Sequence, residues 1–188
     1  MLTRLGAAAC ALVLASFLVG GLPAADEIKS GPQVGERLPG PFHPLNFNGT
    51  GAGKKHCLYC EHGPNPVIMV LARDVSEPLT NLIKKLDAAS EKNKADSLGT
   101  FVVFCNDDQK LPGKLKDLVE SAKLKHTVLA VDAPVGPEDY KFVKQADVTV
   151  VLYVEATVKA NHTFKKGEFK DSDIDKVLGD VTKILPKK

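Results

Sequence analysis

Two cysteines separated by two residues, with histidines close on both sides, form the most chemically informative stretch of the sequence. The stretch reads KKHCLYCEH and contains His56, Cys57, Cys60 and His62. Cysteines with this spacing close a small, reducible disulfide with little backbone cost. The preceding lysine pair and the two histidines make the surroundings electropositive, which favours the thiolate. We therefore predict Cys57 and Cys60 to be a redox pair, with His56 and His62 tuning the thiol pKa.

The same residues also suit two other kinds of site. Two thiolates and two imidazoles form a ligand set for zinc or copper, so His56, Cys57, Cys60 and His62 are an alternative metal site. Adjacent ligands such as His56 and Cys57 rarely point to one centre, however, and structural zinc sites usually draw a second ligand pair from far along the chain. A disulfide that only stiffens a surface loop is the third interpretation. A c-type haem anchor is excluded, because Glu61 occupies the position after Cys60 that requires histidine.

A third cysteine, Cys105, ends an apolar run and precedes Asn106. A free cysteine is commonly a small hydrophobic core residue, and we favour this role. The alternative is a resolving or peroxidatic thiol at the carboxyl end of a strand, where sites gather in open α/β sheets. No basic residue lies beside Cys105 in the sequence to lower its pKa.

The first 25 residues have the pattern of an export signal. Arg4 provides a positive charge, residues 5–22 are apolar, and the following LPAA offers small residues for cleavage. An uncleaved membrane anchor is the alternative, because the apolar run approaches the length that spans a bilayer. We predict a signal peptide over residues 1–25, export to the periplasm or the extracellular space, and no membrane insertion of the mature chain. Disulfides persist in such compartments.

Composition limits the classes of function. The 188 residues are 44% hydrophobic and 26% charged, as in a soluble globular domain. The 25 Lys and Arg against 23 Asp and Glu leave a net charge of only +2, with no basic stripe, so we expect no nucleic-acid partner. The chain contains no phosphate-binding glycine loop and no Ser-His-Asp arrangement. We expect no cofactor.

The apolar pattern predicts an irregular segment followed by an α/β domain. Residues 26–65 are rich in Gly, Pro and Asn, carry the cysteine pair, and contain a weak strand candidate at 42–47. The domain is expected over residues 66–186, with Ser76 capping its first long helix. Predicted strands and helices alternate in the order strand 67–72, helix 77–86, strand 100–105, helix 115–122, strand 127–131, a short helix near residue 140, strands 148–154 and 157–164, and a helix over 174–181.

This order predicts an α/β three-layer sandwich, in which a central mixed sheet has helices on both faces. Together with VGERLPGPF before the first core strand and VVLYVEATVKANHTFKKGE near the end, it resembles the thioredoxin-like superfamily. The resemblance is to exported thiol-disulfide oxidoreductases and the related peroxiredoxins. It implies thiol-disulfide chemistry and protein thiols or disulfides as partners.

The chain departs from that family at the usual active site. The family places its C-x-x-C after the first core strand, where this chain reads ARDVSEP, and Val148 stands where a cis-proline is expected. The cysteine pair is thus displaced to the loop before the strand. By analogy with the family's order, Cys57 is the accessible nucleophile and Cys60 the resolving partner. The alternative is a non-catalytic binding or scaffold protein that keeps a structural disulfide.

Overall fold

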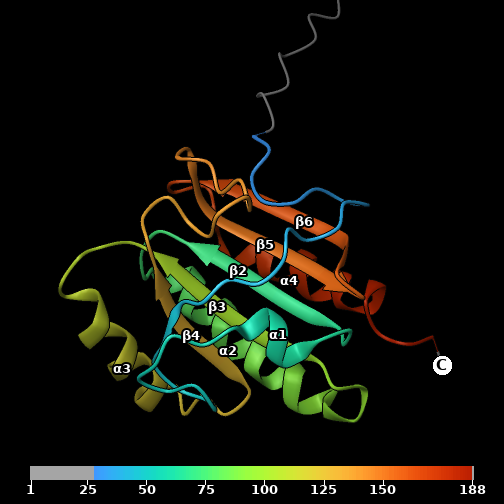
Figure 1. Cartoon of the computed structure of the whole chain (residues 1–188), viewed down its shortest axis with the longest axis horizontal. Coiled ribbons are helices and arrows are strands. Elements are labelled where there is room, and N and C mark those ends of the chain that lie inside the picture. Colours follow the sequence, from blue (N-terminus) through green and yellow to red (C-terminus); the bar gives the residue numbers. More distant parts are fainter. Residues whose placement is uncertain (1–27, 188) are drawn as a thin grey trace, which may run out of the picture.

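The computed structural model describes residues 28–187, which form a six-stranded mixed sheet and four α-helices (Figure 1). The predicted signal peptide at 1–25 lies outside these residues. The elements in chain order are β1 (Leu45–Asn46), α1 (Leu58–His62), β2 (Val67–Ala72), α2 (Glu77–Lys92), β3 (Gly99–Cys105), α3 (Leu111–Ser121), β4 (Thr127–Asp132), β5 (Ala146–Val154), β6 (Thr157–Lys165) and α4 (Asp171–Asp180), with 3-10 turns at Lys94–Asp96 and Val181–Lys183. Within residues 28–187, no helix is both long and apolar enough to cross a membrane.

The central strand of the sheet is β2. The strand order is β1-β4-β3-β2-β5-β6, with β2, β3 and β4 parallel and the other three neighbouring pairs antiparallel. Val67 lies opposite Gly99 of β3 on one side and Tyr153 of β5 on the other. The predicted parallel strands, with an antiparallel pair beside them in the same sheet, are confirmed.

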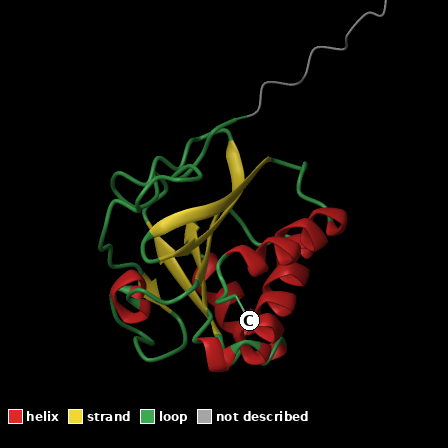
Figure 2. Ribbon diagram, turned by 90° about the vertical axis from the view of Figure 1, so that its right-hand side faces the viewer, coloured by secondary structure: helices red, strands yellow, loops and turns green. Residues whose placement is uncertain are grey.

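The three long helices cover one face of the sheet. The connections from β2 to β3 and from β3 to β4 both step in the same direction across the sheet. Because such crossovers are right-handed, α2 and α3 must lie on the same face. Residues of α2, α3 and α4, including Leu82, Leu115 and Ile174, share one core with that face. Figure 2 shows these helices together on one side of the strands.

The opposite face is covered mainly by irregular chain. Its core contains Leu58 of α1, Phe42 from the N-terminal segment and Tyr140 from the β4–β5 connection. The prediction of a mixed sheet with helices on both faces is confirmed, although α1 is the helix of the described chain that lies on this second face (Figure 2). The N-terminal segment is fixed by main-chain hydrogen bonds, in which Gly35 donates to Val158 at 3.0 Å and Leu38 to Ala156 at 2.8 Å.

The prediction of a short helix near Tyr140 is wrong. The β4–β5 connection has no helix, because Asp139 and Lys141 have φ values of 63° and 54°, which an α-helix does not allow. Tyr140 is instead a buried anchor whose hydroxyl donates to the Gly40 carbonyl at 2.6 Å. The apolar residues near Tyr140 in the sequence pack a loop onto the sheet and do not form one face of a helix.

Ser76 caps α2 as predicted, and this gives a test of the fold. Its hydroxyl accepts from the Leu79 amide at 3.4 Å, and Pro78 lies in the first turn. We expect Ser76→Ala to lower the free energy of unfolding by about 1 kcal/mol, because a helix amide loses its partner. Ser76→Asp should retain most of the stability. Urea denaturation of both variants measures the difference, and equal losses in the two would contradict the capping role.

Candidate functional site

Cys57 and Cys60 form a disulfide at the start of α1. Their Cα atoms lie 5.3 Å apart, and Cys57 is the N-cap of the helix. The amide of Cys60 donates to the Cys57 sulfur at 3.1 Å. Leu58, between them, is fully buried in the core of the second face and so anchors the helix to the sheet. The pair therefore opens a short anchored helix, whereas the sequence predicted a loop.

The two cysteine residues differ in their exposure to solvent. Cys57 is only 7% exposed, whereas Cys60 is an exposed residue. The expectation that Cys57 is the more accessible cysteine is therefore wrong. The N-cap position turns Cys57 toward the covered side of α1, and one turn later Cys60 faces outward.

The two flanking histidines have different surroundings. His56 is half-buried, and its Nε2 lies 2.8 Å from Oε2 of Glu61, within the same short helix as Cys60. The ring of His62 is stacked on Phe101, with the ring centres 5.9 Å apart. It also lies over Gly99, where any Cβ would come within 2.4 Å of the ring. Burial lowers the pKa of His62, so its ring is neutral near pH 7.

The described residues offer no ready metal centre. Nowhere in residues 28–187 do three His, Cys, Asp or Glu side chains converge in a way that could hold a metal ion. The sulfurs of Cys57 and Cys60 are bonded to each other, and His62 is directed at Phe101. The four proposed ligands are close in the sequence, but their side chains do not converge on a common point.

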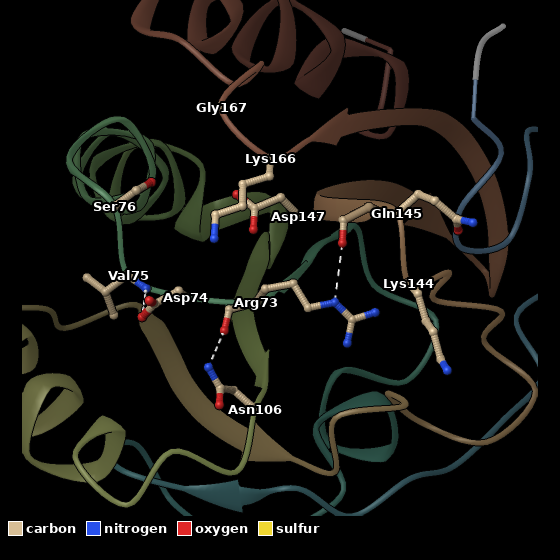
Figure 3. A pocket seen from close by; sticks show the side chains of 11 residues that line it. Arg73, Asp74, Val75, Ser76, Asn106, Lys144, Gln145, Asp147, Lys166 and Gly167 are labelled. Atoms are coloured by element: carbon tan, nitrogen blue, oxygen red, sulfur yellow. Dashed lines mark hydrogen bonds between the residues drawn. The ribbon is translucent and has the colours of Figure 1, made fainter.

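A second candidate site lies at the carboxyl ends of β2 and β3, where the family's active site is expected. It is a cleft of about 520 Å³ (Figure 3). Ligands of open α/β sheets bind in crevices outside the carboxyl ends of the strands, which is where this cleft lies. The cleft is lined by Arg73, Asp74, Val75, Ser76, Asn106, Lys144, Gln145, Ala146, Asp147, Lys166 and Gly167. It contains no cysteine.

Arg73 lines this cleft and joins the segments around it. Its guanidinium donates to the carbonyls of Ala146 at 3.2 Å and Val143 at 3.0 Å, and also to that of Pro134. It lies flat on Phe142, with Cζ 3.9 Å from the ring centre. Arg73 therefore ties the irregular β4–β5 connection to the end of β2. Sequence reasoning missed this role, although a charged residue directly after a fully apolar strand was a usable signal.

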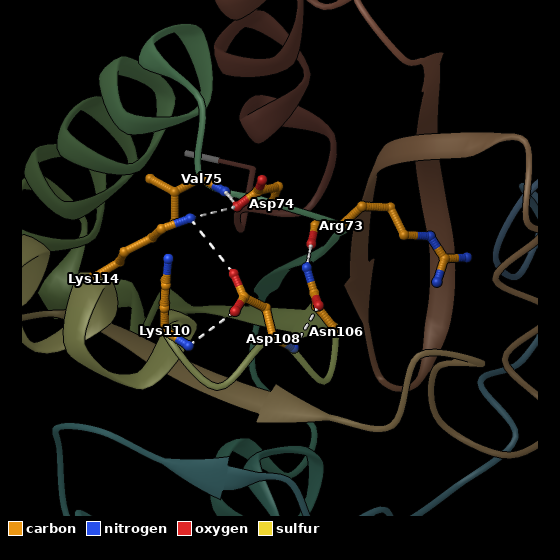
Figure 4. Close-up of polar contacts among 7 residues, drawn as sticks. All are labelled: Arg73, Asp74, Val75, Asn106, Asp108, Lys110 and Lys114. Carbon is orange, nitrogen blue, oxygen red and sulfur yellow. Dashed lines mark hydrogen bonds and ion pairs between the residues drawn. The ribbon is translucent and has the colours of Figure 1, made fainter.

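Polar contacts also hold the loops on the other side of the cleft (Figure 4). Asn106 donates to the Arg73 carbonyl at 2.8 Å, and Lys114 lies 3.6 Å from Asp74 and 3.9 Å from Asp108. Burial raises the pKa of Asp147, which lines the same cleft. These contacts join the ends of β2 and β3 to α3, and no cysteine lines the cleft.

Cys105 is a buried thiol, as the core interpretation predicts. It is 1% exposed, and its Sγ lies 3.6 Å from the position that a Cβ on Gly136 would occupy. Burial raises the pKa of this thiol to about 12, and the nearby positive charge of Arg73 only partly opposes the rise. The basic neighbour that the local sequence lacks is thus provided by the fold, but it does not make the thiol reactive.

Strand order, crossovers and the position of the cleft define a thioredoxin-like fold. No model of a known protein family matches the chain, and no curated protein matches it.

Solved structures share the fold at low sequence identity. A putative protein disulfide isomerase from Bacteroides thetaiotaomicron is 14% identical, with a TM-score of 0.60 over 85% of this chain and 96% of that one. The reduced 2-Cys peroxiredoxin of Plasmodium vivax is 15% identical, with a TM-score of 0.59 over 80% and 81% of the two chains. A secreted disulfide oxidoreductase of Mycobacterium tuberculosis, homologous to E. coli DsbE, is 12% identical, with a TM-score of 0.50 over 75% and 94%. The resemblance inferred from the sequence is confirmed at the level of the fold.

The raised pKa of Cys105 predicts a specific dependence of stability on pH. An unfolded cysteine titrates near 8.5, while the folded thiol keeps its proton until about pH 12. The stabilisation is therefore complete below about pH 8.5 and is lost as the pH rises toward the folded pKa, by up to about 1.4 kcal/mol per pH unit.

We expect Cys105→Ala to lack this decline. Denaturant unfolding of the wild type and the variant between pH 8 and pH 10.5, with Cys57–Cys60 oxidised in both, measures the difference. Parallel curves would mean that the thiol titrates normally in the folded state.

Proposed function

We propose that the protein is an exported thioredoxin-like protein that exchanges disulfides with protein thiols through Cys57 and Cys60. The observation that carries the proposal is the asymmetry of the pair, in which Cys60 is exposed and Cys57 is buried beside a main-chain donor. Exchange requires one sulfur that a thiolate can reach and another that departs as a stabilised thiolate. The short helix α1 supports both requirements.

The balanced reaction assigns a role to each sulfur. A substrate thiolate attacks Sγ of Cys60, the Cys57–Cys60 bond breaks, and its electron pair leaves on Cys57. The amide of Cys60, 3.1 Å from that sulfur, stabilises the thiolate. A second substrate thiolate then attacks the substrate sulfur of the mixed disulfide and releases Cys60. The net result is one substrate disulfide and a reduced cysteine pair, which has taken up two electrons. The reverse direction uses the same steps.

The surrounding charges set the acidity of the reduced pair. Lys54 and Lys55 are exposed immediately before the pair, and His56 is held by Glu61. We propose that the two lysines and His56 favour the thiolate of the reduced pair, while the carboxylate of Glu61 moderates this effect. His62 contributes mainly by packing α1 on Phe101, because its ring is neutral near pH 7.

Export completes the proposal. Residues 1–25 are the proposed signal peptide, residues 26–65 carry the cysteine pair, and residues 66–186 form the thioredoxin-like domain. An oxidising compartment keeps such a pair available as a disulfide. The secreted oxidoreductase of M. tuberculosis, which shares the fold, supports this location. Fractionation of cells that express the full chain tests it, and retention of the uncleaved chain in the cytoplasm would contradict it.

A non-catalytic binding or scaffold protein is the second candidate. It is favoured by the cleft at the carboxyl ends of β2 and β3, which has no thiol, and by the buried anchor Leu58. In that case the disulfide only holds α1 in place.

Single-cysteine variants test the assigned roles. In a Cys105→Ala background, Cys57→Ser leaves the exposed Cys60, which should form a mixed disulfide with an activated aromatic disulfide at least about tenfold faster than Cys57 does in the Cys60→Ser variant, because access limits exchange. Stopped-flow absorbance measures both rates. Faster reaction of Cys57 would reverse the two roles.

The reduction potential separates exchange from a structural staple. Equilibration of the Cys105→Ala protein with a dithiol buffer should give a value more oxidising than about −300 mV. In a separate assay, the same protein should catalyse the reduction of insulin. A potential below that value, together with no insulin reduction, would leave the scaffold candidate.

A further inference from the structure

Residues 53–56 run along the outer side of β1, joined to it by one isolated β-bridge and main-chain hydrogen bonds, and continue directly into Cys57. Leu45 and Lys55 form an antiparallel bridge. Asn46 donates to the Lys54 carbonyl at 3.1 Å, and His56 donates to the Pro44 carbonyl at 3.1 Å. Because β1 pairs with β4 on its other side, residues 53–56 are the outermost chain at this edge of the sheet.

Lys55 presents main-chain groups to the outside of this edge. In an antiparallel pair, hydrogen-bonding residues alternate with residues whose N–H and C=O point away from the partner. Lys54 and His56 bond inward, so the amide and carbonyl of Lys55 point outward. No hydrogen bond between main-chain groups of residues 28–187 uses either of them. Such an open edge is a template for one more extended chain.

An apolar pocket and several positive charges lie along the same edge. The pocket has a volume of about 290 Å³ and is lined by Leu45, Asn46, Phe47, Gly53, Pro112 and Lys116. Leu45 is 38% exposed. Lys54, Lys55 and Lys116 are exposed, and none of the ion pairs found among residues 28–187 involves them. Glu61, the first acid after the cysteine pair in the sequence, is paired with His56.

We propose that this edge binds an extended, acidic segment of a substrate polypeptide, which pairs with Lys55 and delivers its cysteine to Cys60. The proposal rests on the proposed thiol-disulfide exchange. Main-chain hydrogen bonds to Lys55 supply affinity, an apolar substrate side chain enters the pocket, and acidic side chains meet the three lysines.

The separation of the edge from the disulfide fixes the position of the substrate cysteine. Two Cα–Cα steps join Lys55 to Cys57, and 5.3 Å joins Cys57 to Cys60, so the Cα atoms of Lys55 and Cys60 are at most about 13 Å apart. An extended chain advances about 3.3 Å per residue. The reacting cysteine therefore lies within about four residues of the segment that pairs with the edge.

Two synthetic peptides of equal length test the charge preference. Each carries one cysteine preceded by four extended residues that alternate leucine with either glutamate or lysine. The rate at which each peptide thiol opens Cys57–Cys60 is divided by the rate for dithiothreitol with the same protein. We expect the acidic peptide to react about fivefold faster than the basic one at low salt, since exposed charge pairs each contribute modestly, and the difference should shrink as salt is added.

Charge reversal at the edge supplies the matched variants. Lys54→Glu combined with Lys55→Glu should invert the preference for the acidic peptide. Lys84→Glu combined with Lys159→Glu reverses the same number of exposed charges on α2 and β6 and should keep the wild-type preference. Equal ratios for both peptides in the wild type, or inversion by the control pair, would overturn the proposal.

A proline substitution tests the main-chain pairing separately. Lys55→Pro removes the outward amide and no hydrogen bond within the protein, whereas Lys55→Ala removes the same charge and keeps the amide. We expect Lys55→Pro to react with the acidic peptide about threefold to tenfold more slowly than Lys55→Ala, after division by the dithiothreitol rate, as one lost hydrogen bond implies. Equal normalised rates in two variants with the same urea midpoint would exclude strand pairing.

The outcomes distinguish the proposal from the function on which it rests. If neither dithiothreitol nor any peptide opens Cys57–Cys60 in the folded protein, the exchange function fails. If dithiothreitol opens the disulfide, and the peptide rates divided by the dithiothreitol rate of the same protein do not depend on the edge variants, exchange stands and only the edge-binding proposal fails.

Discussion

The burial of β2 is the constraint on which the rest of the structure depends. All six of its side chains are fully buried, and it hydrogen-bonds to a strand on each side. The main-chain N–H and C=O groups at both ends of such a buried strand need hydrogen-bond partners from the protein. At the carboxyl end, the guanidinium of Arg73 donates hydrogen bonds to carbonyls at the end of the β4–β5 connection. At the amino end the carbonyls of Pro64 and Pro66 accept from Glu155 and Gly99, and the disulfide helix α1 lies just before this junction.

The two ends of β2 have consequently become different kinds of surface. At the carboxyl end, a guanidinium stacked on Phe142 ties the loops together, and the position is rigid and polar. At the amino end, a five-residue helix held by Leu58 and His62 exposes one sulfur. The cysteine pair thus lies before the first core strand, and no cysteine lines the cleft at the carboxyl end of that strand. Structural likeness at 12–15% identity reports the arrangement of strands and not the position of a site.

The sequence predicted those parts of the fold that depend on local pattern. Apolar runs such as 67–72 define buried strands, and Ser76 with Pro78 defines a helix start, because these signals lie within a few residues of each other. Contacts between distant segments were not predictable in this way. Tyr140 is buried through Gly40, and Arg73 bonds to residues about 60 to 70 positions away. The cysteine pair itself was recognised from its spacing, but the exposure of Cys60 and burial of Cys57 depend on how Leu58 packs, which only the tertiary structure determines.

The covering of the second face by the N-terminal segment has a consequence for the order of folding. Residues 31–38 are held by partners near Lys141 and in the β5–β6 hairpin, more than 100 positions later in the chain. During synthesis these early residues emerge first, yet they have nothing to dock on until the hairpin exists. Contacts of such long sequence separation form slowly. The covering of the second face by residues 31–38 is therefore completed only after the β5–β6 hairpin has formed.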